Sequence, residues 1–170
     1  MNEHGGLRVK ISSFLDSRRY ENFHLDVGVN DLIMNQFETI SNPDYLSFAE
    51  IEPIHYRCYS IAQHFSEKLH AYTRVFKVGT NSRVKDMIDL FLIAQMVNID
   101  SLSFRNACQL TFEHRSLHHL PEELTPPPKE WEKSFKKMAG DVGIEFSLFE
   151  TFQKLELFIN PMLKHTDNWF

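Results

Sequence analysis

A lysine lies within the apolar face of a predicted helix, and this placement most constrains how the chain can fold. At about 100° per residue, the helix that follows Ser60 gathers large apolar side chains on one face. These are Ile61, Phe65, Leu69 and Tyr72. Lys68 falls inside the same arc, where an ammonium group needs a compensating charge. The next helix, which begins near Ser82, carries Asp86 and Asp89 one turn apart, so we expect these carboxylates to be its partners.

The residues before this helix pair alternate in the manner of β-strands. Apolar and polar side chains alternate over residues 7–13 and again over residues 23–28, with a turn expected at residues 16–19. This pattern predicts a β-hairpin. A further short strand is expected around residues 36–40, and residues 54–59 alternate again and are expected to return to the sheet.

Helices are predicted for the rest of the chain. Ser60 and Gln63 have the spacing of a capping box, which predicts where the lysine-bearing helix begins. Asp100 is expected to cap the helix after the aspartate-bearing one. Two more helices are expected near residues 129–138 and 147–159, beyond a proline-rich break.

A few strands followed by a run of helices are typical of the α+β class. We predict a partial antiparallel or mixed sheet, made of the hairpin and one or two further strands, followed by a helical C-terminal bundle. We predict two domains: residues 1–59 form the strand-rich domain, and residues 60–170 form the helical domain. Because so small a sheet leaves an edge uncovered, we expect association, as a homo-oligomer or with a partner.

Net charge and hydropathy limit the kinds of ligand and partner that the chain can bind. The net charge of −5 argues against a broad attraction to nucleic acid. Two groups of basic residues could still contact an acidic ligand, although solvated surface charge is the favoured interpretation of both. They are Arg8, Lys10, Arg18 and Arg19 near the hairpin turn, and Lys133, Lys136 and Lys137 on a later helix. No apolar stretch is long enough to span a bilayer and the first residues form no signal segment, so we expect a cytoplasmic protein with no membrane partner.

Three segments resemble a known family. Residues 67–74 (EKLHAYTR) and residues 81–90 (NSRVKDMIDL) are similar to the signature of the AbiEii/AbiGii-type nucleotidyltransferase toxins of bacterial abortive-infection systems. Residues 20–28 (YENFHLDVG) resemble the strand that precedes this helix pair in the same family. The resemblance is specific over about residues 5–93. It implies a toxin that is neutralised by a cognate winged-helix antitoxin.

One family feature is missing from the sequence. Members carry a Gly-Gly or Gly-Ser turn followed by an Asp-x-Asp pair on a strand, and no Asp-x-Asp occurs in this chain. Gly5 and Gly6 are no substitute, since a strand without an acidic pair follows them directly. We therefore expect a family member without the N-terminal segment that carries this acidic pair. Its activity is expected to be impaired when the chain is alone. The missing segment is a further candidate partner.

The resemblance also implies the chemistry and its residues. The family reaction transfers a nucleotide from a nucleoside triphosphate (NTP) to an RNA acceptor and uses Mg²⁺. Lys68 resembles the lysine that contacts the nucleotide phosphates. Asp89 is the first candidate for the carboxylate that orients this lysine, and Asp86 is the second. Arg83 at the helix start is a further candidate phosphate contact. Asp26 resembles the third carboxylate of the metal site.

Each of these assignments has a structural alternative. Asp26 also fits a surface or turn-capping aspartate, and Lys68 also fits an internal ion pair that merely fixes two helices together. An i,i+3 surface pair with Asp86 explains Arg83 equally well. The alternative function is accordingly a non-catalytic remnant, or a protein-interaction module that retains the fold.

Overall fold

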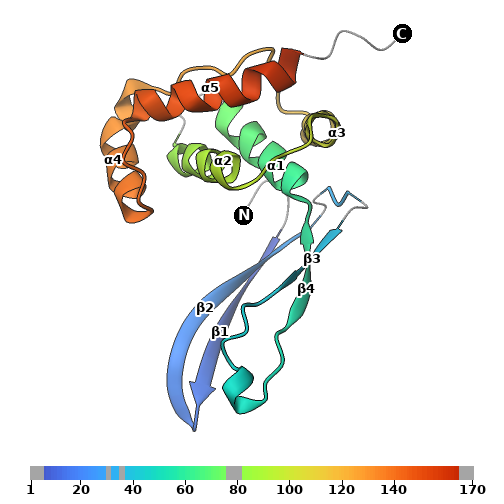
Figure 1. The fold of residues 1–170 in the computed structure, drawn as a ribbon, viewed down its shortest axis with the longest axis vertical. Helices are drawn as coiled ribbons and strands as arrows, with labels where there is room; N and C mark the ends of the chain where they lie inside the picture. The colour runs from blue at the N-terminus through green and yellow to red at the C-terminus, as the bar shows by residue number, and fades with distance from the viewer. Residues whose placement is uncertain (1–5, 30–31, 35–36, 76–81, 165–170) are drawn as a thin grey trace. The chain divides into compact units, whose positions relative to one another are not determined.

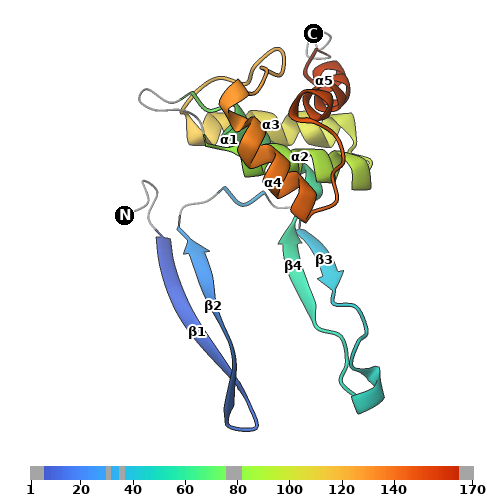
Figure 2. The ribbon, with the colours of Figure 1, turned by 90° about the vertical axis from the view of Figure 1, so that its left-hand side faces the viewer.

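The strands of the chain form two separate antiparallel hairpins. A computed structural model describes residues 6–29, 32–34, 37–75 and 82–164. Contacts divide the chain into two units, Met1–Ile33 and Met34–Phe170. The first hairpin lies in the first unit, and the second hairpin lies in the second unit with the helices (Figures 1 and 2).

Strands β1 (Gly6–Leu15) and β2 (Arg18–Gly28) form the first hairpin. The turn holds only Asp16 and Ser17, whose φ angles of 47° and 61° are both positive, as a two-residue type I′ turn requires. The sequence predicted a four-residue turn over residues 16–19. That prediction was wrong for Arg18 and Arg19, which belong to β2 because the left-handed pair reverses the chain in two residues.

Each face of this hairpin has its own character. Directly paired residues of an antiparallel ladder lie on the same face. The apolar face is built from the pairs Leu7–Val27, Val9–Leu25 and Ile11–Phe23. The opposite face is built from the pairs Arg8–Asp26, Lys10–His24 and Ser12–Asn22. The predicted alternation of residues 7–13 and 23–28 is therefore confirmed.

A β-bulge interrupts the hairpin near its turn. Ser12 pairs with Asn22 but Phe14 pairs with Arg19, so two residues of β2 lie opposite the single residue Ser13. The Ser13 hydroxyl donates to the Glu21 carbonyl at 3.0 Å and accepts from the Glu21 amide at 3.2 Å. The bulge shifts the alternation of β2 by one residue. It thereby places Arg19 on the polar face, where the alternation of β1 already puts Phe14, and leaves Arg18 on the apolar face, opposite Leu15.

The second hairpin pairs β3 (Phe37–Ser41) with β4 (His55–Tyr59), and a short 3-10 helix, η1 (Ser47–Ala49), lies in its connection. Both strands lie where the sequence predicted them, but they pair with each other and not with the first hairpin. The Glu38 carboxylate accepts from the Ile61 amide at 3.0 Å, so β3 helps to cap the helix that follows β4.

The α-helices follow the second hairpin. They are α1 (Ile61–Thr73), α2 (Val84–Met96), α3 (Ser101–Arg115), α4 (Glu132–Asp141) and α5 (Leu148–Lys164), with a 3-10 turn, η2 (Lys129–Trp131), before α4. The α+β class is therefore confirmed. The boundary at residue 59 separates strands from α-helices within the described residues, and as a domain boundary it stays a prediction.

Two predicted caps are confirmed. Ser60 accepts from the Gln63 amide at 3.2 Å, and Asp100 accepts from the Ser103 amide at 2.8 Å. The Gln63 side chain also reaches beyond α1, since its Oε1 atom accepts from the Met34 amide at 3.3 Å. The side chain that would close the box thus ties the chain before β3 to α1.

Helix α1 is the centre of the helical unit, because it packs against both α2 and α3, while α5 packs across α2, α3 and α4 (Figure 1). Its apolar stripe is buried, with Phe65 and Leu69 fully enclosed. The Phe65 ring meets the Phe104 ring of α3 edge-on at 5.6 Å between centroids. None of the helices within the described ranges is long and apolar enough to cross a membrane.

We expect Phe65→Ala to lower the free energy of unfolding by about 3–5 kcal/mol, because it leaves a cavity where three helices meet. Phe48→Ala removes the same atoms from a side chain that is 84% exposed, and we expect it to change stability by less than about 0.5 kcal/mol. Urea unfolding followed by helical circular dichroism measures both. Equal losses in the two variants would contradict the placement of Phe65.

Candidate functional site

Lys68 lies between two aspartates of the neighbouring helix, as the sequence predicted. Its Nζ atom lies 2.6 Å from Asp89 Oδ2 and 3.2 Å from Asp86 Oδ1. The three side chains are partly buried, with 23%, 24% and 12% of the Lys68, Asp89 and Asp86 side chains exposed. We call these three residues the lysine cluster. Such a cluster holds α1 and α2 together while leaving the ammonium group within reach of a ligand.

Three consecutive residues of α1 point to partners on two different helices. The Ser66 hydroxyl lies 2.8 Å from the Thr111 hydroxyl, and Arg115 Nη2 donates to Glu67 Oε2 at 2.9 Å, both across to α3. Lys68 turns instead to α2. The rotation of α1 about its axis is therefore set from both sides, which fixes the direction of the lysine side chain.

Arg83 extends the cluster at the start of α2. Its Nη1 atom lies 3.7 Å from Asp86 Oδ2, while the other oxygen of Asp86 faces Lys68. Asp86 thus bridges two cations, and it also lies in the first turn of α2, where the helix dipole favours a carboxylate. The i,i+3 pair with Asp86, which is the structural alternative for Arg83, is present, and 43% of the Arg83 side chain is exposed.

The protonation state of Lys68 follows from its surroundings. Burial by itself would lower the pKa of Lys68, but the hydrogen bond to Asp89 and the charges of Asp86 and Asp89 outweigh it, and the pKa is raised. The ammonium form therefore persists at neutral pH. It has three N–H donors, and the two aspartates use two of them, so one donor has no partner among the described residues. A phosphate oxygen is a suitable acceptor for that donor.

His64 lies one turn before Lys68 on α1. Partial burial of its ring and the positive charge of Lys68 lower the pKa of His64, against the smaller opposing effects of Asp89 and Glu67. The imidazole is therefore neutral at pH 7. His64 is not among the residues predicted from the sequence, although its i,i+4 spacing to Lys68 was a signal for it.

The predicted metal ligand, Asp26, is engaged by an arginine. Arg8 Nε donates to Oδ1 at 2.6 Å and Nη2 donates to Oδ2 at 2.7 Å, so both carboxylate oxygens are used. The hydrogen bond from Arg8 is the main reason that the pKa of Asp26 is lowered. Within the described residues no three His, Cys, Asp or Glu side chains come together as a metal site would need. As it stands, this carboxylate does not fit Mg²⁺, and its role as a metal ligand stays a prediction.

A histidine pair, in which His70 is buried and His118 half-buried, ties α1 to the segment after α3. The His70 ring lies 4.6 Å from the His118 ring and 4.9 Å from the Phe112 ring, measured between centroids. His118 also lies 2.9 Å from the Thr73 hydroxyl through Nε2. Burial, followed by the charge of Arg74, lowers the pKa of His118, so the His118 ring is neutral at pH 7 and serves as a packing element.

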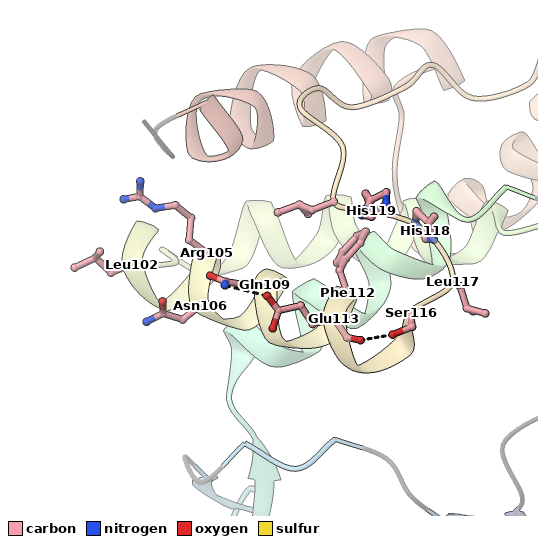
Figure 3. A pocket seen from close by; sticks show the side chains of 11 residues that line it. Leu102, Arg105, Asn106, Gln109, Phe112, Glu113, Ser116, Leu117, His118 and His119 are labelled. Carbon is pink, nitrogen blue, oxygen red and sulfur yellow. Dashed lines mark hydrogen bonds between the residues drawn. The ribbon is translucent and has the colours of Figure 1, made fainter. Parts of the chain in front are cut away.

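A groove of about 980 Å³ lies along α3 and the segment that follows it (Figure 3). Its wall mixes apolar side chains with amides, one arginine and one glutamate. The lining residues are Leu102, Arg105, Asn106, Gln109, Phe112, Glu113, Ser116, Leu117, His118, His119 and Leu120. Gln109 donates to Glu113 at 3.0 Å within this wall. None of the five predicted site residues lines the groove, so it is separate from the lysine cluster.

Together, the fold and the site define an α+β protein in which a helix pair holds a partly buried lysine between two aspartates. A family model described as "Nucleotidyl transferase AbiEii toxin, Type IV TA system" matches residues 2–155. The match covers most of the chain, and the chain belongs to this family of nucleotidyltransferase toxins. The predicted family is therefore confirmed. No curated protein matches the chain.

We expect Lys68→Met to lower the free energy of unfolding by about 1–3 kcal/mol, because it leaves two partly buried carboxylates without their cation. Adding Asp89→Leu should recover most of that loss, since the second substitution removes one of the unpaired charges. Urea unfolding of the single and double variants measures the effect, with Lys68→Arg as the charge-preserving control. Unchanged stability in Lys68→Met would mean that the lysine cluster does not hold α1 to α2.

Proposed function

We propose that this chain binds a nucleoside triphosphate at the lysine cluster and takes part in nucleotide transfer to an RNA acceptor. The single observation that carries the proposal is the Lys68 ammonium group, which two aspartates hold in place while one of its donors is left for a ligand. The family supports the reaction class, since it is a family of nucleotidyltransferase toxins from toxin–antitoxin systems.

Each residue of the site has a proposed role. Lys68 contacts a phosphate oxygen, and Asp89 and Asp86 orient it. Arg83 adds a second phosphate contact at the positive end of α2. Triphosphate binding would draw Lys68 and Arg83 toward the anion, and the two aspartates limit how far they move.

Charge balance points to a further cation. The two basic and two acidic side chains of the site cancel, whereas a bound triphosphate adds several negative charges. The family reaction supplies Mg²⁺ for this purpose, and Asp26 is the proposed ligand from this chain. Arg8 would first have to release the carboxylate, so we assign no step to the metal.

We also propose binding partners and a cellular location for the chain. The cognate antitoxin is the proposed regulatory partner, in a cytoplasmic setting. A segment that carries an Asp-x-Asp pair is the proposed source of the missing metal ligands, and without it we expect transfer to be impaired. Homo-oligomerisation remains a proposal that rests on the two-stranded sheets of the described residues, since the edge strands of so small a sheet can pair with a further strand.

The second candidate function is a non-catalytic binding module that keeps the fold. Two observations favour it. The sequence has no Asp-x-Asp, and the one carboxylate predicted to bind metal is held by Arg8 through both oxygens. Such a module would bind a triphosphate or a protein without transferring a nucleotide.

We expect Lys68→Gln to weaken triphosphate binding about ten- to a hundredfold, because it removes a charge-assisted hydrogen bond to phosphate. Titration of a fluorescent, non-hydrolysable NTP followed by anisotropy measures the affinity. Lys85→Gln is the matched control, since Lys85 is an exposed lysine of α2 outside the lysine cluster. Wild-type affinity in a Lys68→Gln variant with a native circular dichroism spectrum would refute the proposed site.

Nucleotide transfer separates the two candidate functions. We expect the full chain, incubated with labelled NTP, Mg²⁺ and total RNA, to label RNA weakly or not at all alone, and to label it strongly when a segment with the family Asp-x-Asp pair is added. No labelling under either condition, with triphosphate binding intact, would favour the binding module. Strong labelling by the chain alone would show that no added carboxylates are needed.

A further inference from the structure

We propose that the polar face of the β1–β2 hairpin binds single-stranded RNA, with Lys10 and Arg19 on its phosphates and Phe14 stacked on a base. This inference rests on the proposed function, because it names the surface that holds the acceptor of that reaction. We call this surface the hairpin polar face. Its paired residues are Arg8 with Asp26, Lys10 with His24, Ser12 with Asn22 and Phe14 with Arg19.

The charge of this face is opposite to that of the chain. The whole protein has a net charge of −5, whereas residues 6–28 contain four basic and three acidic side chains. The hairpin polar face itself has three basic side chains, from Arg8, Lys10 and Arg19, and one carboxylate, from Asp26. Asp26 is already paired with Arg8. Lys10 and Arg19 form no ion pair with any described residue. Two cations on an exposed ribbon are thus available to an anionic ligand.

The bulge in β2 creates this arrangement. If the register of Ser12 with Asn22 continued without the shift, Tyr20 rather than Arg19 would pair across from Phe14, and Arg19 would lie opposite Leu15 on the other face. Bulges of this kind change the direction in which a side chain points, and they often do so beside functional surfaces. Here the bulge brings a guanidinium group to the polar side, next to an aromatic ring.

Phe14 has no evident packing role on this face. Its side chain is 63% exposed among polar neighbours, and the aromatic contacts found within the described residues do not include it. An exposed ring beside cations is the usual means by which proteins bind unpaired bases, since every base can stack on it. Arg19 opposite Phe14 and Lys10 two pairs away supply the charges for the flanking phosphates.

The geometry favours a single strand over a duplex. Residues on one face of a strand repeat about every 7 Å, so the ten residues of β1 span about 33 Å and can follow several nucleotides. Stacking on Phe14 needs a base that is not paired, whereas a duplex offers only its phosphates to this surface. An acidic peptide would use the cations but would leave the ring unused.

The test measures binding of a labelled 12-nucleotide single-stranded RNA to the full chain by fluorescence anisotropy, at several salt concentrations. We expect Lys10→Glu/Arg19→Glu to weaken binding about tenfold or more, and to reduce the slope of log K against log salt by about 1.4. Phe14→Leu should weaken binding about fivefold while leaving the salt slope unchanged, since it removes stacking without removing charge.

The matched control is Arg18→Glu/Lys133→Glu. It changes the net charge by the same amount, but at one residue on the opposite face of the hairpin and one on α4. We expect near wild-type RNA affinity. Equal weakening in this control would overturn the proposal in favour of a net-charge effect. Equal competition by duplex DNA or by polyglutamate would also overturn it.

Triphosphate titration of the same variants separates this inference from the proposed function. Loss of RNA binding in Lys10→Glu/Arg19→Glu with unchanged triphosphate affinity supports the hairpin surface. RNA binding that survives in that variant overturns the hairpin surface, even if Lys68→Gln still loses the triphosphate. RNA binding that depends on Lys10 and Arg19 in a protein that binds no triphosphate supports the surface and refutes the proposed nucleotide site.

Discussion

The ion pairs between Lys68 and the two aspartates of α2 are the interaction on which the helical unit depends. An ammonium group among apolar neighbours is tolerated only because Asp89 lies 2.6 Å away and Asp86 lies 3.2 Å away. The same pairs link α1 to α2, and they raise the pKa of Lys68, so the lysine stays charged at neutral pH. Structural and functional explanations of Lys68 are therefore not exclusive, because the proposed phosphate contact would use the donor that the two aspartates leave.

The features predicted well from the sequence are those encoded within a few residues. Helical periodicity placed Lys68 opposite the aspartates, and the caps at Ser60 and Asp100 set where α1 and α3 begin. Strand alternation placed the hairpins. Each of these signals involves neighbours along the chain, so a single sequence contains them in full.

The features that were missed depend on contacts between distant residues. The pairing of Asp26 with Arg8 requires the register of β1 against β2, and a bulge that shifts this register leaves no clear mark in the alternation. His70 falls outside the apolar stripe of α1, yet it is 5% exposed, because His118 and Phe112 pack over it from a segment much later in the chain. Likewise, the alternation of β3 and β4 could not show that they pair with each other and form a separate sheet.

The consecutive residues Ser66, Glu67 and Lys68 have a consequence for how this chain can vary. Their three side chains contact Thr111, Arg115 and the α2 aspartates from adjacent positions on one helix. Deleting or inserting a single amino acid upstream within α1 would turn the following residues by about 100°, and every one of those contacts would be lost together. Point substitutions in α1 can be absorbed one at a time, but a change in its length cannot. Related chains should therefore differ in the lengths of their loops and hairpins while keeping the number of residues between the Ser60 cap and Lys68 constant.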